Sequence, residues 1–396
     1  MNAHNSPSPP AFANAHPTRG HIRALDGLRG IAVLMVMVLH FYPKWLIAEE
    51  FPRLTPLLGR IVAPGAWGVP LFFVLSGFLI TGILLDTKGQ PAFLLKFYAR
   101  RTLRIFPLYY GALVAIFFIL PLVLPLDAGG QAIAARQGWL WTYLSNWSGS
   151  GTWDDSALFN LNHLWSLCVE EHFYMFWPLA VVLLSPRQLA KLALGLMAMS
   201  LALRFGRALD GSTLFMWSTL NNLDGLAIGA LIAIVPREPS LSGRLPSGKA
   251  YRRLLWVFGL TGLAYVMMPR RLHLPILDAP GEMIIAVCFG LVLLGVLRLK
   301  PGEAWHRLLV LSPLVTFGKY SYGLYVIHGI LRPAFERLFD LRALPDSHWL
   351  PFLWMLLYYA LTIGASLALA WLSYHGFEKW FLNLKRHFEY APEKAG

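Results

Sequence analysis

Long apolar runs recur from one end of this chain to the other, separated by short segments rich in Pro, Gly and charged residues. A run of about 20 apolar residues can cross a bilayer as an α-helix. The pattern therefore predicts an all-α membrane bundle of about ten transmembrane helices, at 30–47, 66–85, 105–125, 162–184, 188–205, 219–235, 254–268, 280–298, 311–331 and 350–374.

Basic residues are unevenly shared among the connecting segments. With the N-terminus inside, the inner segments carry roughly twice as many Lys and Arg as the outer ones, in agreement with the positive-inside rule. Both termini are therefore predicted to be cytoplasmic. No secretory signal pattern opens the chain. We expect a disordered tail over 1–20, one membrane domain over 21–382 and a cytoplasmic tail over 383–396.

Composition agrees with a membrane protein. Of 396 residues, 56 % are hydrophobic and 14 % are charged, whereas soluble chains carry about 25 % charged residues. The net charge of +13 is distributed between apolar spans, so it indicates topology and contact with anionic lipid, and we expect no nucleic-acid partner. Metal-ligand spacings, phosphate-binding glycine loops and nucleophile elbows do not occur.

The first apolar run holds a titratable side chain, His40, eleven positions after Arg29. Eleven steps of about 100° complete roughly three turns and rise about 16 Å, so both side chains lie on one stripe of a helix. With Arg29 at the membrane surface, His40 is predicted near the middle of the hydrocarbon core, where a titratable group is costly and typical of a functional site. The alternative is a histidine hydrogen-bonded between packed helices.

A cluster of cations follows the second span. Lys96, Arg100 and Arg104 repeat every four residues with Arg101 alongside, so one helix presents all four together. Guanidinium groups bind phosphate oxygens in bidentate fashion, which favours a soluble, diphosphate-bearing donor such as a coenzyme A thioester. The alternative is ordinary positive-inside charge lying on anionic lipid.

The fourth span begins with a polar stripe, because Asn162, Ser166, Glu170 and Tyr174 repeat every four residues. Glu170 would lie about 12 Å into the helix, close to the depth assigned to His40. A carboxylate inside a membrane span is difficult to explain by packing alone. We therefore take Glu170 as a catalytic candidate, and Ser166 and Tyr174 as substrate contacts.

Two other spans contribute candidate substrate contacts. In span nine, Tyr325 and His328 share one helix face with Ser321 and Arg332. His328 would hold an acceptor hydroxyl or line a polar passage, and a packing role is equally compatible with its position. Span two offers Ser76, although small residues also let helices approach closely there.

Taken in order, these motifs resemble the acyltransferase-3 family of multi-pass membrane acyltransferases. The resemblance covers about 21–382 and rests on six segments: DGLRGIAVLMVMVLH with Arg29 and His40, FFVLSGFLI at 72–80, RRTLRIFPLYY with Arg100, Arg101 and Arg104, HLWSLCVEEHFY with Ser166, Glu170 and Tyr174, SYGLYVIH with Tyr325 and His328, and YHGFEKWF. Two departures are expected. Pro70 stands where members often carry Asp, and we expect this chain to lack the secreted hydrolase-like domain of some relatives.

The resemblance implies O-acylation, usually acetylation, of carbohydrate hydroxyls on surface or secreted glycans or glycolipids in a bacterial-type cell membrane. The implied co-substrate is a cytoplasmic acyl-coenzyme A, and we expect no permanently bound cofactor and no metal. His40 would act as a general base or as a transient acyl carrier, with Glu170 orienting its imidazole. The alternative is a proton-coupled transporter or flippase for a lipid-linked saccharide, since intramembrane His and Glu also suit proton coupling.

Overall fold

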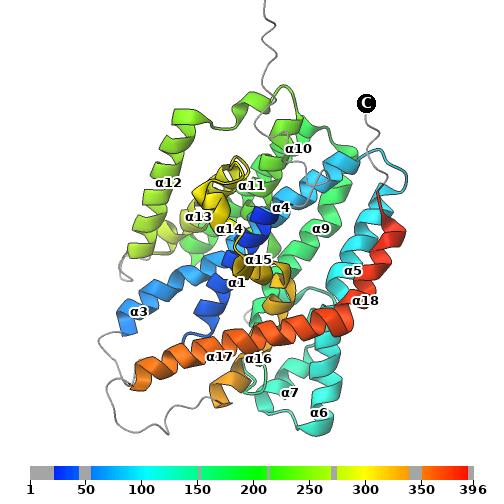
Figure 1. Ribbon diagram of the computed structural model, residues 1–396, viewed down its shortest axis with the longest axis vertical. Coiled ribbons are helices and arrows are strands. Elements are labelled where there is room, and N and C mark those ends of the chain that lie inside the picture. The colour runs from blue at the N-terminus through cyan, green and yellow to red at the C-terminus, as the bar shows by residue number, and fades with distance from the viewer. Residues whose placement is uncertain are drawn as a thin grey trace, which may run out of the picture.

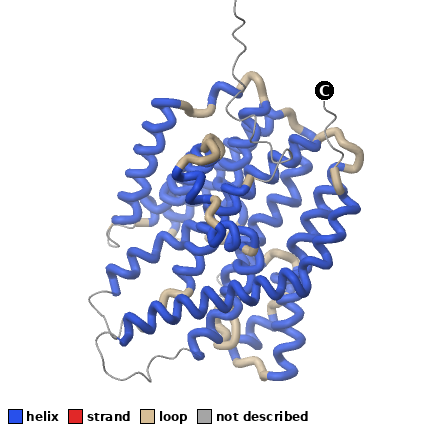
Figure 2. Tube along the Cα trace, viewed as in Figure 1, coloured by secondary structure: helices blue, strands red, loops and turns tan. Residues whose placement is uncertain are grey.

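The computed structural model describes residues 22–43, 55–149, 153–211, 215–268, 274–338 and 350–390, and in these ranges it contains helices, turns and loops but no β-strand (Figure 2). The predicted all-helical fold is confirmed. The α-helices are α1 (Arg23–His40), α3 (Thr55–Val62), α4 (Gly68–Thr87), α5 (Phe93–Val114), α6 (Leu120–Val123), α7 (Ala128–Ala135), α8 (Gly138–Trp141), α9 (Trp165–Leu183), α10 (Pro186–Asp210), α11 (Asp224–Ile234), α12 (Gly248–Met267), α13 (Pro275–Val296), α14 (Ala304–Leu309), α15 (Ser312–Lys319), α16 (Ser321–Leu338), α17 (Leu350–Ser373) and α18 (Lys379–Asn383).

Five helical stretches among the described residues are long and apolar enough to cross a membrane: Pro56–Thr87, Phe93–Val123, Pro186–Asp210, Pro275–Val296 and Leu353–Phe388. The other predicted spans coincide with helices that are shorter or more polar. For example, α11 has only 11 residues, and α1 carries an aspartate and two further charged residues near its start. The total of about ten spans and the cytoplasmic location of the termini stay predictions.

Two predicted spans differ from the helices that the structure contains. The span predicted at 30–47 ends as a helix at His40, because Pro43 disfavours helical backbone at the residue before it; residues 44–47 lie outside the described ranges. The span predicted at 311–331 is two helices, since α15 ends at Lys319 and α16 begins at Ser321. His40 therefore lies at the end of its helix and not within it.

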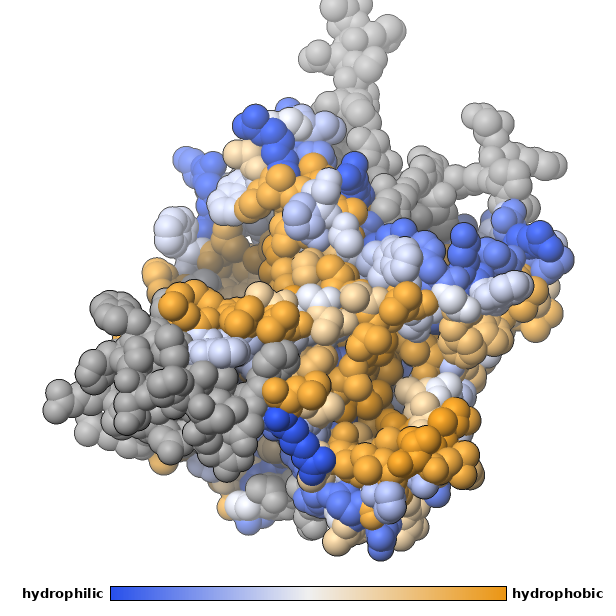
Figure 3. Space-filling model, turned by 60° about the horizontal axis from the view of Figure 1, so that its bottom comes forward, coloured by the Kyte–Doolittle hydropathy of each residue, from blue (hydrophilic) through white to orange (hydrophobic). Residues whose placement is uncertain are grey.

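The two ends of the bundle carry different segments (Figure 1). The turn that joins α4 to α5 lies near α18 and the end of the described chain at the upper right, whereas α6 and α7 lie at the bottom. Residues 88–92 and 383–390, which belong to segments predicted inside, thus lie at the opposite end from 126–149, which belong to the segment predicted outside at 126–161. On the face shown in Figure 3, hydrophobic side chains occupy the middle and hydrophilic ones gather along the upper right and lower edges.

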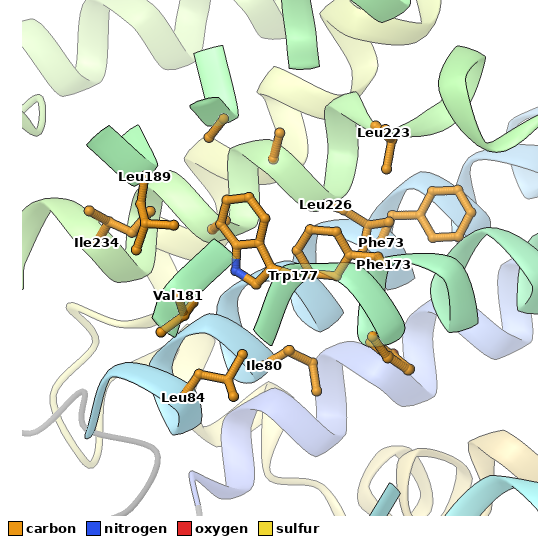
Figure 4. Packing of buried hydrophobic residues seen from close by; sticks show 14 of the residues in the cluster. Phe73, Ile80, Leu84, Phe173, Trp177, Val181, Leu189, Leu223, Leu226 and Ile234 are labelled. Carbon is orange, nitrogen blue, oxygen red and sulfur yellow. The ribbon is translucent and has the colours of Figure 1, made fainter. Parts of the chain in front are cut away.

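The core is built around α4, which packs against α1, α9, α11 and α13. In Figure 4, the indole of Trp177 from α9 lies among aliphatic and aromatic side chains of α4 and α11. Its N–H donates a hydrogen bond of 2.9 Å to the Thr81 hydroxyl, which satisfies the one polar atom of a buried ring. Large apolar side chains from separate spans therefore fix the relative positions of the helices that hold the polar residues.

Glycines set the distance between α4 and α11. A Cβ atom on Gly77 would collide with the carbonyl oxygen of Leu226, and one on Gly229 would collide with the carbonyl oxygen of Val74. The two backbones approach so closely only because neither glycine has a side chain. Ser76, next to Gly77, is thereby held at a fixed position against the neighbouring helices.

Replacing Gly77 with valine is expected to destabilise the protein by about 1–3 kcal/mol or more, because the added carbons have no space against α11. The measurement is the thermal unfolding midpoint in detergent, together with the yield of monodisperse protein. Gly206→Val is the matched control, since a Cβ on Gly206 of α10 meets no atom within 4 Å. Equal midpoints for the two variants would contradict this account of α4–α11 packing.

A buried ion pair joins α10, α11 and α13. Arg204 Nη2 lies 2.6 Å from Asp224 Oδ2, and Arg204 Nη1 lies 3.0 Å from Glu282 Oε2. Arg204 and Asp224 are both buried, and a buried charge is tolerated when it is paired in this way. The buried carboxylate of Asp224 is thus a structural partner and lines neither of the cavities described below.

Candidate active site

Two cavities lie beside α4 and α16, and Val69 and Tyr325 are in the walls of both. The larger cavity has a volume of about 920 Å³, and we call it the arginine cavity. Its lining residues are Arg29, Val69, Phe72, Phe73, Ser76, Ile83, Asp86, Thr87, Gln90, Phe97, Arg100, Arg101, Arg104, Ile105, Ser166, Leu167, Glu170, Tyr174, Ser321, Tyr322, Tyr325, Lys385, Glu389 and Tyr390. The smaller, the histidine cavity, has a volume of about 250 Å³ and is lined by Val36, Leu39, His40, Gly65, Ala66, Val69, Asp154, Asn160, Asn162, His163, Trp165, Trp217, Tyr325, Gly329 and Arg332.

One face of α5 supplies cations to the arginine cavity. Arg100, Arg101 and Arg104 line it, as their spacing predicts. Lys96 is not among the lining residues, and its role in donor binding stays a prediction. The side chain one position later, Phe97, occupies the cavity-facing stripe, and a helix turns by about 100° between neighbouring residues.

Arg29, from the first helix, α1, lies in the same cavity as these arginines. It lines the arginine cavity and lies 3.6 Å from Asp26, one turn earlier on its own helix. Among the residues that the structure describes, Arg101 and Arg104 form no ion pair with a carboxylate. Five cations, from Arg29, Arg100, Arg101, Arg104 and Lys385, line the cavity together with three carboxylates, from Asp86, Glu170 and Glu389, so positive charge is in excess there.

The polar stripe of α9 reaches both cavities. Ser166, Glu170 and Tyr174 line the arginine cavity, and Asn162, at the start of the stripe, lines the histidine cavity. The Ser76 hydroxyl donates a hydrogen bond of 2.6 Å to Glu170 Oε1. From the sequence, Ser76 was compatible with either helix packing or substrate contact. In the structure it positions the Glu170 carboxylate in the cavity wall.

Tyr325 stands between the cavities. Its hydroxyl lies 2.5 Å from the hydroxyl of Ser166 and donates to the carbonyl oxygen of His163 at 3.2 Å. Tyr325 and Val69 line both cavities and so belong to the wall that the cavities share. The predicted substrate contacts Ser166 and Tyr325 thus form one hydrogen-bonded element at the boundary.

His40 and His328 form a close pair. Nδ1 of His40 lies 2.8 Å from Nε2 of His328, and the two rings are nearly parallel, with an angle of 12° and centroids 5.0 Å apart. His328 is fully buried, at 0 % exposure, so its polar atoms depend on protein partners. The imidazole of His40 lines the histidine cavity.

The hydrogen bonds of this pair define which ring nitrogens carry hydrogen. Nδ1 of His328 lies 2.9 Å from the carbonyl oxygen of Leu324, which can only accept, so this nitrogen is the donor and Nε2 of the neutral ring holds the lone pair. Nε2 therefore accepts a hydrogen bond from Nδ1–H of His40. The Nε2 atom of His40 is then left unprotonated and available to take a proton or to attack an electrophile.

The contacts contradict the predicted partnership between Glu170 and His40. The two side chains line different cavities, and their polar partners in the structure are Ser76 and His328 respectively. Similar depth along two helices does not require contact, because each side chain's direction depends on how its helix is rotated about its axis. His328, predicted as a substrate contact, holds the orienting position that Glu170 was expected to hold.

A third imidazole adjoins the pair. The ring of His163 lies 5.1 Å from that of His328, and its Nε2 donates to the carbonyl oxygen of Val326 at 3.1 Å. A side chain on Gly329 of α16 would collide with the His163 ring, so this glycine makes room for the cluster. These contacts place His163 beside the His40–His328 pair.

Two residues in the arginine cavity were not predicted. Lys385 and Tyr390 follow the last predicted span and were assigned to a cytoplasmic tail, yet both line the cavity. The only sequence signal was the basic run Lys385–His387. A short basic run after a final span is expected from topology alone, so the pattern did not separate a ligand contact from ordinary inside charge.

A hydrogen-bonded carboxylate holds the rim of the histidine cavity. Asp127, at the start of α7, accepts hydrogen bonds from the Ala157 N–H and the Ser156 hydroxyl, both at 2.7 Å, and from the Gly130 N–H at 3.1 Å. The segment so held, 153–161, includes the lining residue Asn160. Burial by itself raises the pKa of Asp127, but these hydrogen bonds outweigh it and hold the pKa below its ordinary value.

Asp127→Asn is expected to loosen segment 153–161 at neutral pH, because an amide cannot accept the same set of bonds as a carboxylate. A group whose folded pKa is depressed stabilises above its ordinary pKa, about 3.9, and loses this contribution as pH falls through the folded pKa. Hydrogen exchange of the segment should therefore differ between wild type and variant near pH 6, and this difference should shrink below about pH 3. A pH-independent difference would contradict this assignment. Asp155→Asn is the control, since it changes an exposed carboxylate 3.8 Å from Arg136 and leaves the hydrogen bonds of Asp127 in place.

Comparison with known proteins adds a family and several relatives. A family model described as an acyltransferase domain matches residues 22–371. The chain is 28 % identical over 333 residues to the peptidoglycan O-acetyltransferase OatA of Listeria monocytogenes, a match that covers 78 % of this chain and 49 % of the relative. No solved structure matches.

Two other relatives agree. O-acetyltransferase OatA of Staphylococcus aureus is 28 % identical over 334 residues, covering 78 % of this chain and 50 % of the relative. The putative peptidoglycan O-acetyltransferase YrhL of Bacillus subtilis is 29 % identical over 342 residues, covering 79 % and 49 %. The chain thus spans about half the length of the curated relatives that it matches.

Proposed function

Because the chain belongs to the acyltransferase-3 family, whose domain model matches residues 22–371, we propose that it moves an acetyl group from acyl-coenzyme A to a carbohydrate hydroxyl. The curated relatives are named O-acetyltransferases, two of them of peptidoglycan, which supports acetyl as the acyl group and a glycan as the acceptor. The donor would occupy the arginine cavity and the acceptor the histidine cavity.

One observation carries this proposal: a cavity rich in arginine shares Val69 and Tyr325 with a cavity that contains His40. A phosphate-bearing donor fits a cavity whose lining cations outnumber its carboxylates. Its pantetheine arm would bring the thioester toward the shared wall, where an acceptor hydroxyl approaches from the other side. The arginine cavity would face the cytoplasm, because it lies toward the end of the bundle that holds the chain's inner segments.

In the first version of the reaction, His40 is a general base. Its Nε2 takes the proton of the acceptor hydroxyl while the oxygen forms a bond to the thioester carbonyl carbon. The carbon–sulfur bond then breaks, and the leaving thiolate takes that proton from the imidazolium. The products are the O-acetyl ester and coenzyme A, and His40 returns to its starting state.

In the second version, His40 carries the acyl group. Nε2 attacks the thioester carbonyl, the carbon–sulfur bond breaks, and an N-acyl imidazolium and a thiolate form. The acceptor oxygen then bonds to the acyl carbon, the carbon–nitrogen bond breaks, and the proton released by the hydroxyl neutralises the thiolate, which restores neutral His40. Placement of His40 outside the arginine cavity supports this version, because a carrier would relay the acyl group across the shared wall. Incubation with labelled acetyl-coenzyme A but no acceptor distinguishes the two, since only a carrier yields labelled protein that depends on His40.

The activity itself is tested with purified protein, radiolabelled acetyl-coenzyme A and a glycan acceptor. Label is expected in the acceptor as an ester that mild base releases. Vectorial movement of a lipid-linked saccharide in vesicles, without esterification, would instead support the transporter. Mass spectrometry of surface glycans from cells with and without the protein then identifies the acceptor.

A further inference from the structure

The last described residues, 384–390, which we call the C-terminal segment, pack against α5 and form part of the arginine cavity. They comprise the helical turn Leu384–Phe388 and the two residues after it. The predicted domain boundary at 382 would have placed them in a separate tail. The arginine cavity is instead completed by the chain's C-terminal end, at the upper right of Figure 1.

Hydrogen bonds from Arg100 hold the C-terminal segment against α5. Its Nη1 donates to the carbonyl oxygens of Lys385 and Phe388, at 3.3 and 3.4 Å, and its guanidinium lies over the ring of Tyr390, 5.6 Å from the centroid. Carbonyl groups at a helix C-terminus lack intrahelical partners and are satisfied in this way by a cation. Arg100 is therefore a positioning residue whose donors are already partly used by the protein.

The side chain of Lys385 belongs to the cavity wall, unlike that of the next residue, Arg386. It is half-buried and lines the cavity, whereas Arg386, the next residue, is exposed and does not. Within the described ranges, Lys385, Arg101 and Arg104 form no ion pair with a carboxylate. Three positive side chains around one space repel one another, and an anion bound between them removes this repulsion.

We propose that the C-terminal segment binds the nucleotide end of the acyl donor, with Lys385 contacting a phosphate and Tyr390 offering its ring to the purine. This inference rests on the proposed function, because it specifies where in that cavity the donor's nucleotide lies. Coenzyme A joins a diphosphate, a 3′-phosphate and an adenine at one end, which matches a cluster of cations beside an aromatic ring. Glu389 is the exposed carboxylate at the same edge of the cavity.

The test measures binding of coenzyme A to the purified full-length protein by calorimetry. A hydrogen bond to a charged phosphate contributes about 1.5–3 kcal/mol, so Lys385→Ala is expected to raise Kd by roughly tenfold or more. Arg386→Ala is the matched control and should leave Kd within about twofold, because its side chain is exposed and outside the cavity. Tyr390→Ala should weaken binding and Tyr390→Phe should not.

A second ligand separates a phosphate contact from a general loss of structure. Pantetheine carries neither a phosphate nor the adenine, so Lys385→Ala and wild type should bind it equally. If Lys385→Ala weakens both ligands to the same degree, or leaves the Kd for coenzyme A unchanged, the inference is wrong while the proposed function stands. If wild-type protein does not bind coenzyme A at all, the donor in the proposed function is wrong.

Discussion

Replacing His40 with alanine is expected to lower the rate of acetyl transfer by about 10²–10⁴-fold, the usual contribution of a positioned general base. Sugar hydroxyls are weak nucleophiles at neutral pH, and His40 lines the cavity with a lone pair left unbonded at Nε2. His163 also lines this cavity, but its unbonded ring nitrogen, Nδ1, is buried. The measurement is transfer of label from acetyl-coenzyme A to a glycan acceptor, at equal amounts of folded protein in membranes.

His172→Ala is the matched control for this loss. His172 belongs to α9, its Nδ1 lies 2.5 Å from the Thr219 hydroxyl, and it lines neither cavity. We expect its removal to leave transfer largely intact. Near-normal transfer by the His40→Ala protein, or equal losses for both variants, would overturn the assignment of His40.

Replacing His328 with alanine is expected to lower kcat by about 10²-fold or more, because a catalytic imidazole loses most of its activity when its tautomer is no longer fixed. His328 acts through His40: its Nε2 accepts from His40 Nδ1–H, and its own Nδ1–H is held by the Leu324 carbonyl. KM for acetyl-coenzyme A should change little, since His328 does not line the arginine cavity.

Two further variants separate positioning from packing at this fully buried site. His328→Gln keeps a side-chain oxygen that can accept from His40, so it should recover part of the lost kcat. His328→Phe keeps the ring volume without an acceptor and should remain as slow as the alanine variant. Recovery by Phe and not by Gln would show that the side chain only fills space.

Much of the site was predictable because helical periodicity is a local property. A helix that contains Arg100, Arg101 and Arg104 at their spacing has to present them on nearby faces, and the stripe from Asn162 to Tyr174 follows from the same geometry. The predicted sets therefore line the cavities as groups. Lys96 lies outside the lining for the same geometric reason, since a rotation of about 100° about the helix axis separates it from the cavity-facing stripe that Phe97 occupies.

The apolar pattern by itself determined that this chain is an all-helical bundle, which of its helices carry polar stripes, and which residues share each stripe. Only the tertiary structure decided which stripes meet. His40 and His328 are 288 positions apart, and their contact depends on the rotation and depth of two helices packed by glycines and large apolar side chains. The same packing put Arg29 and His40, on one continuous helix, into two different cavities, and folded the C-terminal segment back onto α5. A repeat of about 3.6 residues fixes directions around a single helix axis and contains no information about the angle between two axes.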